Sequence, residues 1–284
     1  MFTVIVPLFN KEYSIKDCLS SVFAQEGEAA LEVILVNDGS TDASLYVVKS
    51  SFEGEIQSGL LKVVSQENSG VSAARNKGVE KSKFNYLCFL DADDEWQPGF
   101  LSAISDLINS FPDAVMYSTG HFVKKKDKDI VIKRSGYQKD FCGYVEDFFI
   151  SSTKGDIVNS SKVCMRKDIF ERCGGFPERA IIGEDLFLWI QAALQGKVAF
   201  NAAPLVIIKQ LHDFSRFKRR NKVPYPISFY SKNRIPVGLD LSKSLESYLF
   251  MIFYKHVASS LLGLRGYEAY SIFRAYLKLR VINF

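Results

Sequence analysis

Acidic residues gather where a short apolar segment of this 284-residue chain ends. The segment YLCFL, residues 86–90, runs directly into Asp91, Asp93 and Asp94. Carboxylates this close together repel one another unless a cation or hydrogen-bond donors compensate them. Their hard oxygens suit Mg²⁺ or Mn²⁺, and a nucleotide diphosphate would complete the coordination. The alternative interpretation is a solvated acidic turn that caps the helix after Pro98.

Three further polar clusters also lie beside apolar segments. In EVILVNDGSTDAS, a strand–turn–helix connection explains Gly39 and the helix cap, but it does not require Asp38. In ENSGVSAARNKGV, Arg75 can reach a carbonyl or phosphate, although a lone arginine is more often a surface residue. Glu184 and Asp185 open an amphipathic helix whose dipole alone favours acids by roughly 0.3–1 kcal/mol. The functional interpretation makes one of this pair a general base.

The elements that must position these residues alternate along the first 110 residues. Apolar runs at residues 3–7, 32–36, 61–65 and 86–90 predict strands, with helical spacings between them. This alternation predicts an α/β fold of βαβ units, with a parallel sheet covered by helices on both faces. Because ligands bind at the carboxyl ends of such strands, we expect the acidic clusters to face one cleft.

The rest of the chain is less regular. Strands are predicted at residues 115–123 and 198–208, and helices at 167–173 and 185–195, with a charged hairpin around KKKDKD. From residue 241 the spacing is helical, with a break at residues 263–266.

The net charge of +4 is the sum of two segments whose net charges have opposite signs. Residues 1–208 carry 22 Lys and Arg against 28 Asp and Glu, whereas residues 209–284 carry 14 against 4. A basic tail of this kind is expected to meet a membrane surface, a phosphorylated acceptor or nucleic acid. Its helical stretches combine apolar and basic residues, as an interfacial membrane anchor does. Packing on the body of the protein or a homodimer contact explains them equally well.

Other features narrow the class of protein. The five cysteines are scattered without a CxxC pair, which indicates neither a zinc site nor a disulfide framework and favours a reducing cytoplasm. No apolar run reaches the ~18 residues of a membrane span, and no leader is evident before the first predicted strand. A Walker-type nucleotide site is excluded because the chain has no GxxxxGK[ST].

Five motifs occur together in a meaningful order: VPLFN, NDGSTD, NSGVSAARN, FLDADDEW and GEDLFLW. In this order they resemble the family 2 glycosyltransferases, inverting enzymes with the GT-A fold. The resemblance covers residues 1–213 and implies a Rossmann-like, mostly parallel sheet flanked by helices. Residues 214–284 lie beyond it and are expected to form a basic, aromatic-rich, mostly helical C-terminal extension.

The resemblance implies a set of donor-binding residues. The loop in and after the first strand is similar to one that packs around the nucleotide base, through Pro7, Phe9 and Glu12. Asp38 is similar to the family aspartate that hydrogen-bonds the uracil ring. Arg75 and Asn68 match positions beside the base and the phosphates. Asn37 departs from the pattern, because the family often has a second acidic residue there.

The remaining implied roles concern the metal and the chemistry. Asp91 and Asp93 fill the D-x-D pattern, with Asp91 expected near the ribose and Asp93 on the metal. His212 is similar to a family histidine that reaches the metal or diphosphate, and a structural role explains it equally well. Asp185 matches the catalytic base, with Glu184 beside it in the acceptor site.

The resemblance therefore predicts metal-assisted transfer from a UDP-sugar, with Mn²⁺ or Mg²⁺, to a cell-surface polysaccharide or lipid-linked glycan. The enzyme would lie in the cytoplasm, peripheral on the inner face of the membrane. A non-catalytic sugar-nucleotide-binding protein is the first alternative, although it would not need Asp185. A nucleic-acid-binding protein is the second, but the tail contains no recognisable binding module.

Overall fold

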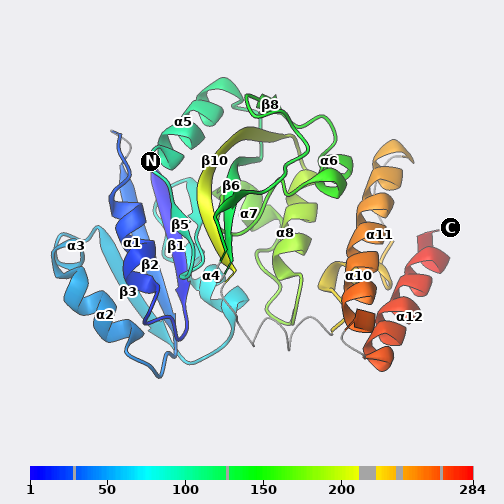
Figure 1. The fold of residues 1–284 in the computed structure, drawn as a ribbon, viewed down its shortest axis with the longest axis horizontal. Coiled ribbons are helices and arrows are strands. Elements are labelled where there is room, and N and C mark those ends of the chain that lie inside the picture. The colour runs from blue at the N-terminus through cyan, green and yellow to red at the C-terminus, as the bar shows by residue number, and fades with distance from the viewer. Residues whose placement is uncertain (28–29, 126–127, 211–221, 235–238, 263–264, 284) are drawn as a thin grey trace.

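The computed structural model describes residues 1–27, 30–125, 128–210, 222–234, 239–262 and 265–283 (Figure 1). The strands are β1 (Phe2–Leu8), β2 (Leu31–Asp38), β3 (Leu61–Gln66), β4 (Tyr86–Phe89), β5 (Glu95–Trp96), β6 (Met116–Lys125), β7 (Val131–Ile132), β8 (Cys142–Tyr144), β9 (Val163–Arg166) and β10 (Val198–Gln210). The helices are α1 (Ile15–Phe23), α2 (Ser44–Ser51), α3 (Glu53–Gln57), α4 (Val71–Glu80), α5 (Phe100–Ser110), α6 (Phe148–Lys154), α7 (Lys167–Arg172), α8 (Glu184–Ala193), α10 (Tyr225–Tyr230), α11 (Leu239–Leu262) and α12 (Gly266–Asn283).

The N-terminal half of the sheet is parallel. Its strand order is β3-β2-β1-β4, with Val4 opposite Val33 on one side and Cys88 on the other. The side chains of β2 from Val33 to Asp38 are all buried, as expected for a parallel strand covered on both faces. This half confirms the predicted βαβ organisation, and it places the carboxyl ends of β1, β2 and β4 at one edge of the sheet.

The C-terminal half of the sheet is mixed. Strand β9 lies between β4 and β6 and is antiparallel to both, while β6 and β10 are parallel. Strands β5 and β8 pair antiparallel with β10, and β7 pairs antiparallel with β6. The sequence does not predict β9 because VCMR is short and runs directly into a helix. Its insertion brings the residues just before Val163 beside the loop after β4.

Helix α4 packs unusually close to the sheet. A Cβ atom on Gly78 would lie 2.5 Å from Cγ2 of Ile5 in β1, which is closer than such atoms approach in proteins. The absence of a side chain at this position therefore sets the distance between α4 and the central strand. This contact also fixes the distance of Arg75 from the sheet, because Arg75 lies on the same helix.

Two apolar clusters fill the two faces of the sheet. Val4 and Val6 of β1 face a cluster that includes residues of α1 and α5. Ile5 points to the opposite face, into a cluster that contains Trp189 of α8 and Leu249 of α11. Helices of the C-terminal segment thus share a core with the sheet, and they lie together beside α6 and α8 (Figure 1). Among the described helices, none is long and apolar enough to cross a membrane.

Candidate active site

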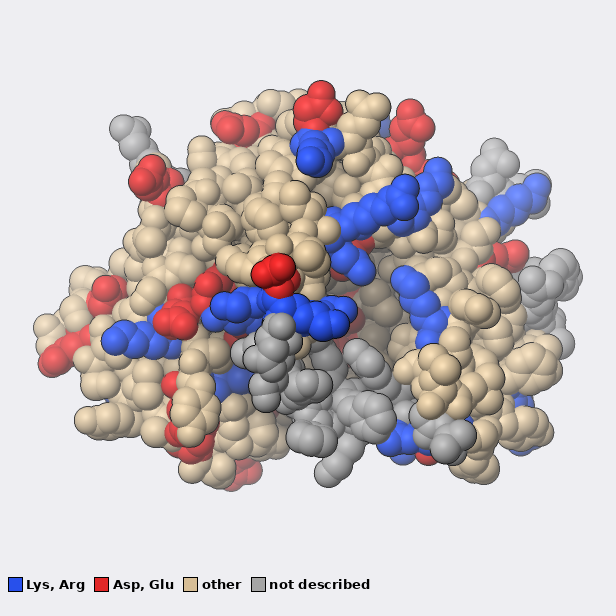
Figure 2. All heavy atoms as spheres, in the orientation of Figure 1, with Lys and Arg blue, Asp and Glu red and all other residues tan. Residues whose placement is uncertain are grey.

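Charged side chains of both signs lie close together near the carboxyl ends of the parallel strands. On the face shown in Figure 2, Lys and Arg side chains gather across the middle of the molecule, with Asp and Glu side chains beside them. Three ion pairs lie in this region of the structure. Arg75 binds Asp91 and Glu184, and Lys11 binds Asp93.

Asp38 is the last residue of β2 and lies against the N-terminus of α4. One carboxylate oxygen accepts hydrogen bonds from the Ser69 backbone N–H and from Nε2 of Gln66, both at 2.8 Å. The other accepts from the Gly70 backbone N–H at 2.9 Å. The positive end of the helix dipole favours an anion at this position. Asp38 therefore holds the start of α4 in place, whatever else it binds.

Asn68 lies next to Asp38, as predicted. Its Nδ2 donates a hydrogen bond of 2.9 Å to the Asp38 carbonyl oxygen. Gly39 makes this approach possible, because a Cβ atom there would lie 2.9 Å from the Asn68 backbone nitrogen. The φ angle of Gly39 is +71°, which disfavours other residues for a second reason. The turn after β2 and the turn after β3 thus form one surface.

The loop after β1 is bonded to the start of α2. Asn10 adopts a φ of 52° and accepts a hydrogen bond from the Thr41 backbone N–H through Oδ1 at 2.8 Å. Glu12 accepts from the Ala43 backbone N–H at 2.8 Å, so its carboxylate serves the N-terminus of α2 in this structure. Phe9 is 45% exposed and Pro7 is half-buried, which leaves the Phe9 ring accessible to a planar ligand.

Arg75 connects the loop after β4 with the start of α8. Its Nη2 lies 2.6 Å from Oδ1 of Asp91, and its Nη1 lies 3.5 Å from Oε1 of Glu184. The guanidinium also lies over the ring of Phe176, 5.0 Å from its centre. Arg75 is buried, and among the described residues neither its Nε nor its Nη1 has a hydrogen-bond acceptor. Arg75 is therefore hydrogen-bonded to Asp91 and faces Glu184 as an ion pair, which links two acidic segments.

Asp93 and Lys11 form the most accessible ion pair of the site. The Lys11 ammonium lies 2.6 Å from Oδ2 of Asp93, and the two side chains are 30% and 33% exposed. No local sequence pattern indicates a role for Lys11, because its partner lies 82 residues away in the chain. The structure adds it to the site.

Asp94, next to Asp93 in the chain, is a buried carboxyl group with a structural function. It accepts hydrogen bonds from Oγ of Ser161 at 2.5 Å and from the Lys209 backbone N–H at 2.8 Å. Burial and the charges of Asp91 and Asp93 raise the pKa of Asp94 well above its usual value. Residues 91–94, between β4 and β5, form what we call the acidic loop. Asp94 therefore connects this loop to β10 and to the segment before β9. No local sequence pattern indicates these pairings.

Asp185 lies partly buried in the first turn of α8, after Gly183 with a φ of 80°. Its Oδ1 accepts a hydrogen bond of 2.7 Å from the Leu186 backbone N–H. Burial, and secondly the charge of Glu184, raise the pKa of Asp185 from 3.8 to about 7, against the lowering effect of Arg75. A carboxylate with this pKa is suited to take up a proton near neutral pH.

Helix α4 thus brings the predicted residues together. Its N-terminus holds Asp38, and Arg75 holds Asp91 and Glu184 about a turn and a half further along. The charge of Asp91 acts on Asp185, so these two also lie close. His212 lies outside the described residues.

The acidic loop fits a divalent cation that takes most of its ligands from phosphate and water. Among the described residues, no group of three or more His, Cys, Asp or Glu side chains is placed to hold a metal ion. Mg²⁺ is commonly bound by one or two carboxylates together with phosphate oxygens and water. Asp93, whose carboxylate is partly exposed, matches this requirement, whereas Asp94 is buried and already bonded.

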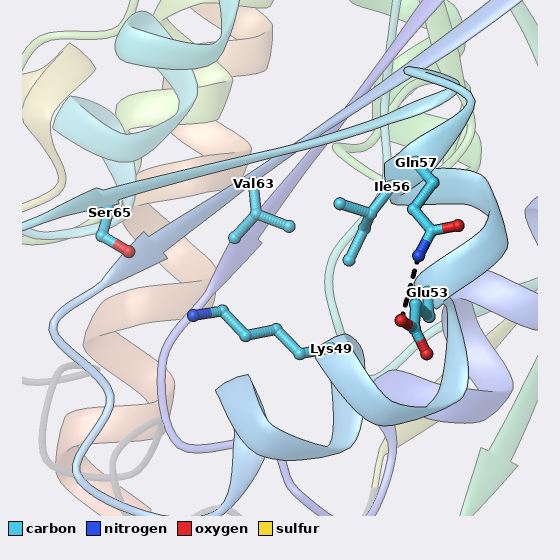
Figure 3. A pocket seen from close by; sticks show the side chains of 6 residues that line it. All are labelled: Lys49, Glu53, Ile56, Gln57, Val63 and Ser65. Atoms are coloured by element: carbon cyan, nitrogen blue, oxygen red, sulfur yellow. Dashed lines mark hydrogen bonds between the residues drawn. The ribbon is translucent and has the colours of Figure 1, made fainter.

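One open pocket lies apart from this site. Figure 3 shows Lys49 and the α3 side chains facing the edge strand β3 across it, with Gln57 donating a 3.0 Å hydrogen bond to Glu53. It has a volume of about 520 Å³ and is lined by Lys49, Glu53, Ile56, Gln57, Val63 and Ser65. It contains none of the predicted site residues.

Comparison with known proteins identifies the family to which these motifs are similar. The model of the family described as Glycosyl transferase family 2 matches residues 3–174. The amylovoran biosynthesis glycosyltransferase AmsB of Erwinia amylovora is 29% identical over 232 residues, which are 78% of this chain and 72% of that protein. Two other curated relatives are 42% and 40% identical, but these matches span 13% and 27% of their lengths.

Solved structures show the fold. TarS of S. aureus in complex with UDP-GlcNAc superposes with a TM-score of 0.62 and 17% identity, covering 97% of this chain and 89% of that chain. A mannosyltransferase of Pyrobaculum calidifontis in complex with GDP-Man and Mn²⁺ gives a TM-score of 0.60 and 19% identity, covering 99% and 86%. These neighbours have the GT-A fold, which confirms the predicted fold class.

Proposed function

The chain belongs to glycosyl transferase family 2, and on that premise we propose that it transfers a sugar from a nucleoside diphosphate sugar to an acceptor hydroxyl, with inversion. The observation that carries this proposal is the position of Asp185. It lies beside the Arg75–Asp91 pair and has a pKa near neutrality. A non-catalytic sugar-nucleotide-binding protein would have no use for such a base.

The proposed chemistry is a single displacement at the anomeric carbon. The acceptor oxygen forms a bond to that carbon while the bond to the leaving nucleoside diphosphate breaks. Asp185 takes the proton of the acceptor hydroxyl during this step, and general base catalysis typically contributes 10²–10⁴-fold. Glu184 lies next to the base in the acceptor site, where its ion pair with Arg75 orients it. The attack comes from the face opposite the leaving group, which gives inversion.

For the donor we propose a UDP-sugar, bound between Phe9, Asp38 and Asn68, with Arg75 and Asp91 near the ribose and phosphates. Pro7 and Glu12 complete the loop beside the base. A divalent cation, Mn²⁺ or Mg²⁺, would be held by Asp93, with His212 as a second ligand, and would neutralise the leaving diphosphate. Neighbouring structures hold UDP-GlcNAc in one case and GDP-Man with Mn²⁺ in another, which supports a nucleoside diphosphate donor.

The acceptor and the setting are also part of the proposal. The name of AmsB refers to amylovoran biosynthesis, which supports a cell-surface polysaccharide or lipid-linked glycan as the acceptor. We further propose a GT-A domain at residues 1–213 with an extension at 214–284, located in the cytoplasm. The five cysteines are free thiols, which agrees with a reducing compartment.

The extension is proposed to attach the enzyme to an anionic membrane surface. Exposed apolar side chains lie on both α11 and α12, and ring contacts join the two helices: the Phe250 ring lies 5.8 Å from Tyr276, and Phe253 lies 6.2 Å from Phe273. We call the exposed set the aromatic ridge; it consists of Phe250, Tyr254, Tyr270, Phe273 and Leu277, which are 46% to 63% exposed. The same two helices carry exposed basic residues, Lys255, Arg274 and Lys278. Interfacial membrane anchors combine apolar and basic side chains in this way.

Ligand-induced stabilisation tests the donor site directly. A nucleotide at 100 times its dissociation constant stabilises a protein by about 2.7 kcal/mol, or about 5–10 °C in Tm for a chain of this size. We expect UDP or a UDP-sugar with Mn²⁺ to give such a shift, measured by differential scanning fluorimetry against a panel with GDP. Asp38→Asn should abolish the shift, whereas Asp168→Asn, in an exposed residue of α7, should keep it. A panel in which no nucleotide raises Tm contradicts the proposal.

A further inference from the structure

We infer that Lys11 is a further donor-binding residue, whose ammonium binds the diphosphate of the donor and is held by Asp93 in the donor-free protein. This inference rests on the proposed function, since it names another ligand of the same substrate. The observation behind it is the 2.6 Å ion pair between Nζ of Lys11 and Oδ2 of Asp93. It joins the loop after β1 to the loop after β4, across the edge where the strands end.

The backbone of Lys11 is fixed, so its side chain starts from a defined position. Its N–H donates a 2.7 Å hydrogen bond to Oγ of Ser44, and its carbonyl oxygen accepts from the backbone N–H groups of Ser14 and Ile15 at 3.0 Å. These bonds join the first turn of α1 to the start of α2. The four methylene groups of the side chain then carry the ammonium to the acidic loop.

The Lys11–Asp93 pair differs from the other ion pairs of the site in its exposure. Arg75 is buried and held between Asp91 and Glu184. Lys11 and Asp93 are each about one third exposed, and an ion pair of this kind adds little net stability. The ammonium can therefore exchange one anion for another at small cost. A diphosphate carries more charge than a carboxylate and offers several acceptor oxygens, so it is the stronger partner.

Asp93 has two competing partners in this scheme. It is the carboxylate that best fits a divalent cation, and a cation bound there would displace the Lys11 ammonium by like-charge repulsion. The released ammonium lies next to the site where the diphosphate binds. Lys11 thus neutralises Asp93 in the donor-free protein and the leaving group in the complex. Loss of Lys11 should weaken the binding of a diphosphate and not the binding of a nucleoside.

The first experiment compares UDP with uridine by isothermal titration calorimetry, with GDP and guanosine instead if the nucleotide panel selects them. Lys11→Met should lower UDP affinity about tenfold or more, the value of one charge-assisted contact, and leave uridine affinity unchanged. Lys16→Met is the matched control, because Lys16 is exposed on α1 and has the same charge. Equal UDP affinity in wild type and Lys11→Met overturns the inference, whereas a wild type that binds no nucleotide overturns the proposed function.

The second experiment tests the partner exchange. In EDTA, Asp93→Asn should raise UDP affinity, because the Asp93 carboxylate no longer competes with the diphosphate for Lys11, and this gain should shrink in the Lys11→Met background. With Mn²⁺, Asp93→Asn should lower UDP affinity instead. A gain in EDTA that is equal in both backgrounds reflects charge repulsion by Asp93 alone and overturns the role of Lys11. An unchanged affinity with Mn²⁺ contradicts the proposed metal ligand and leaves the Lys11 result intact.

Discussion

At the scale of single residues, Asp185 combines two properties that rarely occur together. It is a carboxyl group whose pKa lies near 7, and it lies in the first turn of a helix, where an anion is usually favoured. Burial and the neighbouring Glu184 outweigh the lowering effects of Arg75 and of the hydrogen bond from the Leu186 backbone N–H. A carboxyl group with this pKa is half ionised at neutral pH, which suits it to proton transfer in both directions.

This balance predicts both the activity and the stability of Asp185→Asn. Transfer should fall by 10²-fold or more, while wild-type activity should rise with pH through about 7 as the base ionises. The raised pKa means that folding favours the protonated form. The stability from this group is thus fully present below pH 4 and is lost as the pH rises to about 7.

Because the ionisation of Asp185 lowers the stability of the wild type as the pH rises, two measurements at different pH test this prediction. The Tm of Asp185→Asn relative to wild type should be higher at pH 8 than at pH 5, because the variant has no carboxylate to ionise. Nucleotide binding, measured in parallel, should stay intact. Glu171→Gln, which changes an exposed acid of α7, should alter neither the pH profile nor the Tm difference. Wild-type turnover by Asp185→Asn would remove the base assignment.

The positions of site residues were predictable where a local pattern marked them. Asp38 ends one buried strand, Asp91 and Asp93 follow another, and the structure places all three at one edge of the sheet. Lys11 and Ser161 were not predictable, because each binds an acid of the loop 91–94 from a remote segment. Such pairings depend on the tertiary structure, which brings distant segments of the chain together. The roles assigned by resemblance stay predictions.

At the scale of elements, α4 determines how the two halves of the site are related. Its N-terminus binds Asp38 and its middle carries Arg75, so a displacement of the helix moves both. Asn76, next to Arg75, receives a 2.9 Å hydrogen bond from the Phe176 N–H and donates one of 2.9 Å to the Phe176 carbonyl oxygen. The helix thereby also positions the ring over which the Arg75 guanidinium lies.

Gly78→Ala should displace this helix. The added methyl group would lie 2.5 Å from Cγ2 of Ile5, and overpacking of this kind typically costs about 1–3 kcal/mol. We expect Tm to fall by about 2–12 °C and nucleotide affinity to fall with it. Gly54→Ala on α3 is the control, because nothing lies within 4 Å of its added Cβ and alanine is the better helix former. Equal Tm values for the two variants would contradict the close packing of α4.

The elements themselves were predictable to different degrees. The parallel strands β1 to β4 were predicted because each is an apolar run between turn residues, and β6 and β10 because they are long. Strands β5 and β9 were not, because two to four residues give no period to read. The antiparallel position of β9 depends on pairing with Cys88 and Tyr117, which no local pattern encodes.

At the scale of the whole molecule, the C-terminal helices extend the protein without forming a separate core. Ile227 of α10 and Leu249 of α11 belong to the same cluster as Trp189 of α8. The Tyr225 N–H donates a 2.9 Å hydrogen bond to the Ile182 carbonyl oxygen, just before the first turn that holds Asp185. The described part of the extension thus packs on the body through one face and presents the aromatic ridge on another.

Vesicle binding tests the proposed role of that ridge. We expect co-sedimentation with vesicles of phosphatidylcholine and phosphatidylglycerol, little with phosphatidylcholine alone, and release by salt. Phe250→Ser combined with Phe273→Ser should lower binding severalfold, whereas Tyr46→Ser, in an exposed residue of α2, should leave it unchanged. Equal binding by the ridge variant would exclude the membrane role. Light scattering would test a second possibility. If the wild type is a dimer and the ridge variant is a monomer, the ridge binds a second copy of the protein instead.

Tyr248 of α11 lies deep in this shared core, and the charge of Asp185 reaches its phenol. Tyr248 lies more than sixty positions beyond Asp185 in the chain, yet it packs in the same region of the molecule. Burial is the main cause of the raised pKa of Asp185, so a smaller side chain at position 248 would let water closer to that carboxyl group and lower its pKa. The segment beyond the family motifs thus contributes to the acidity of a residue within them.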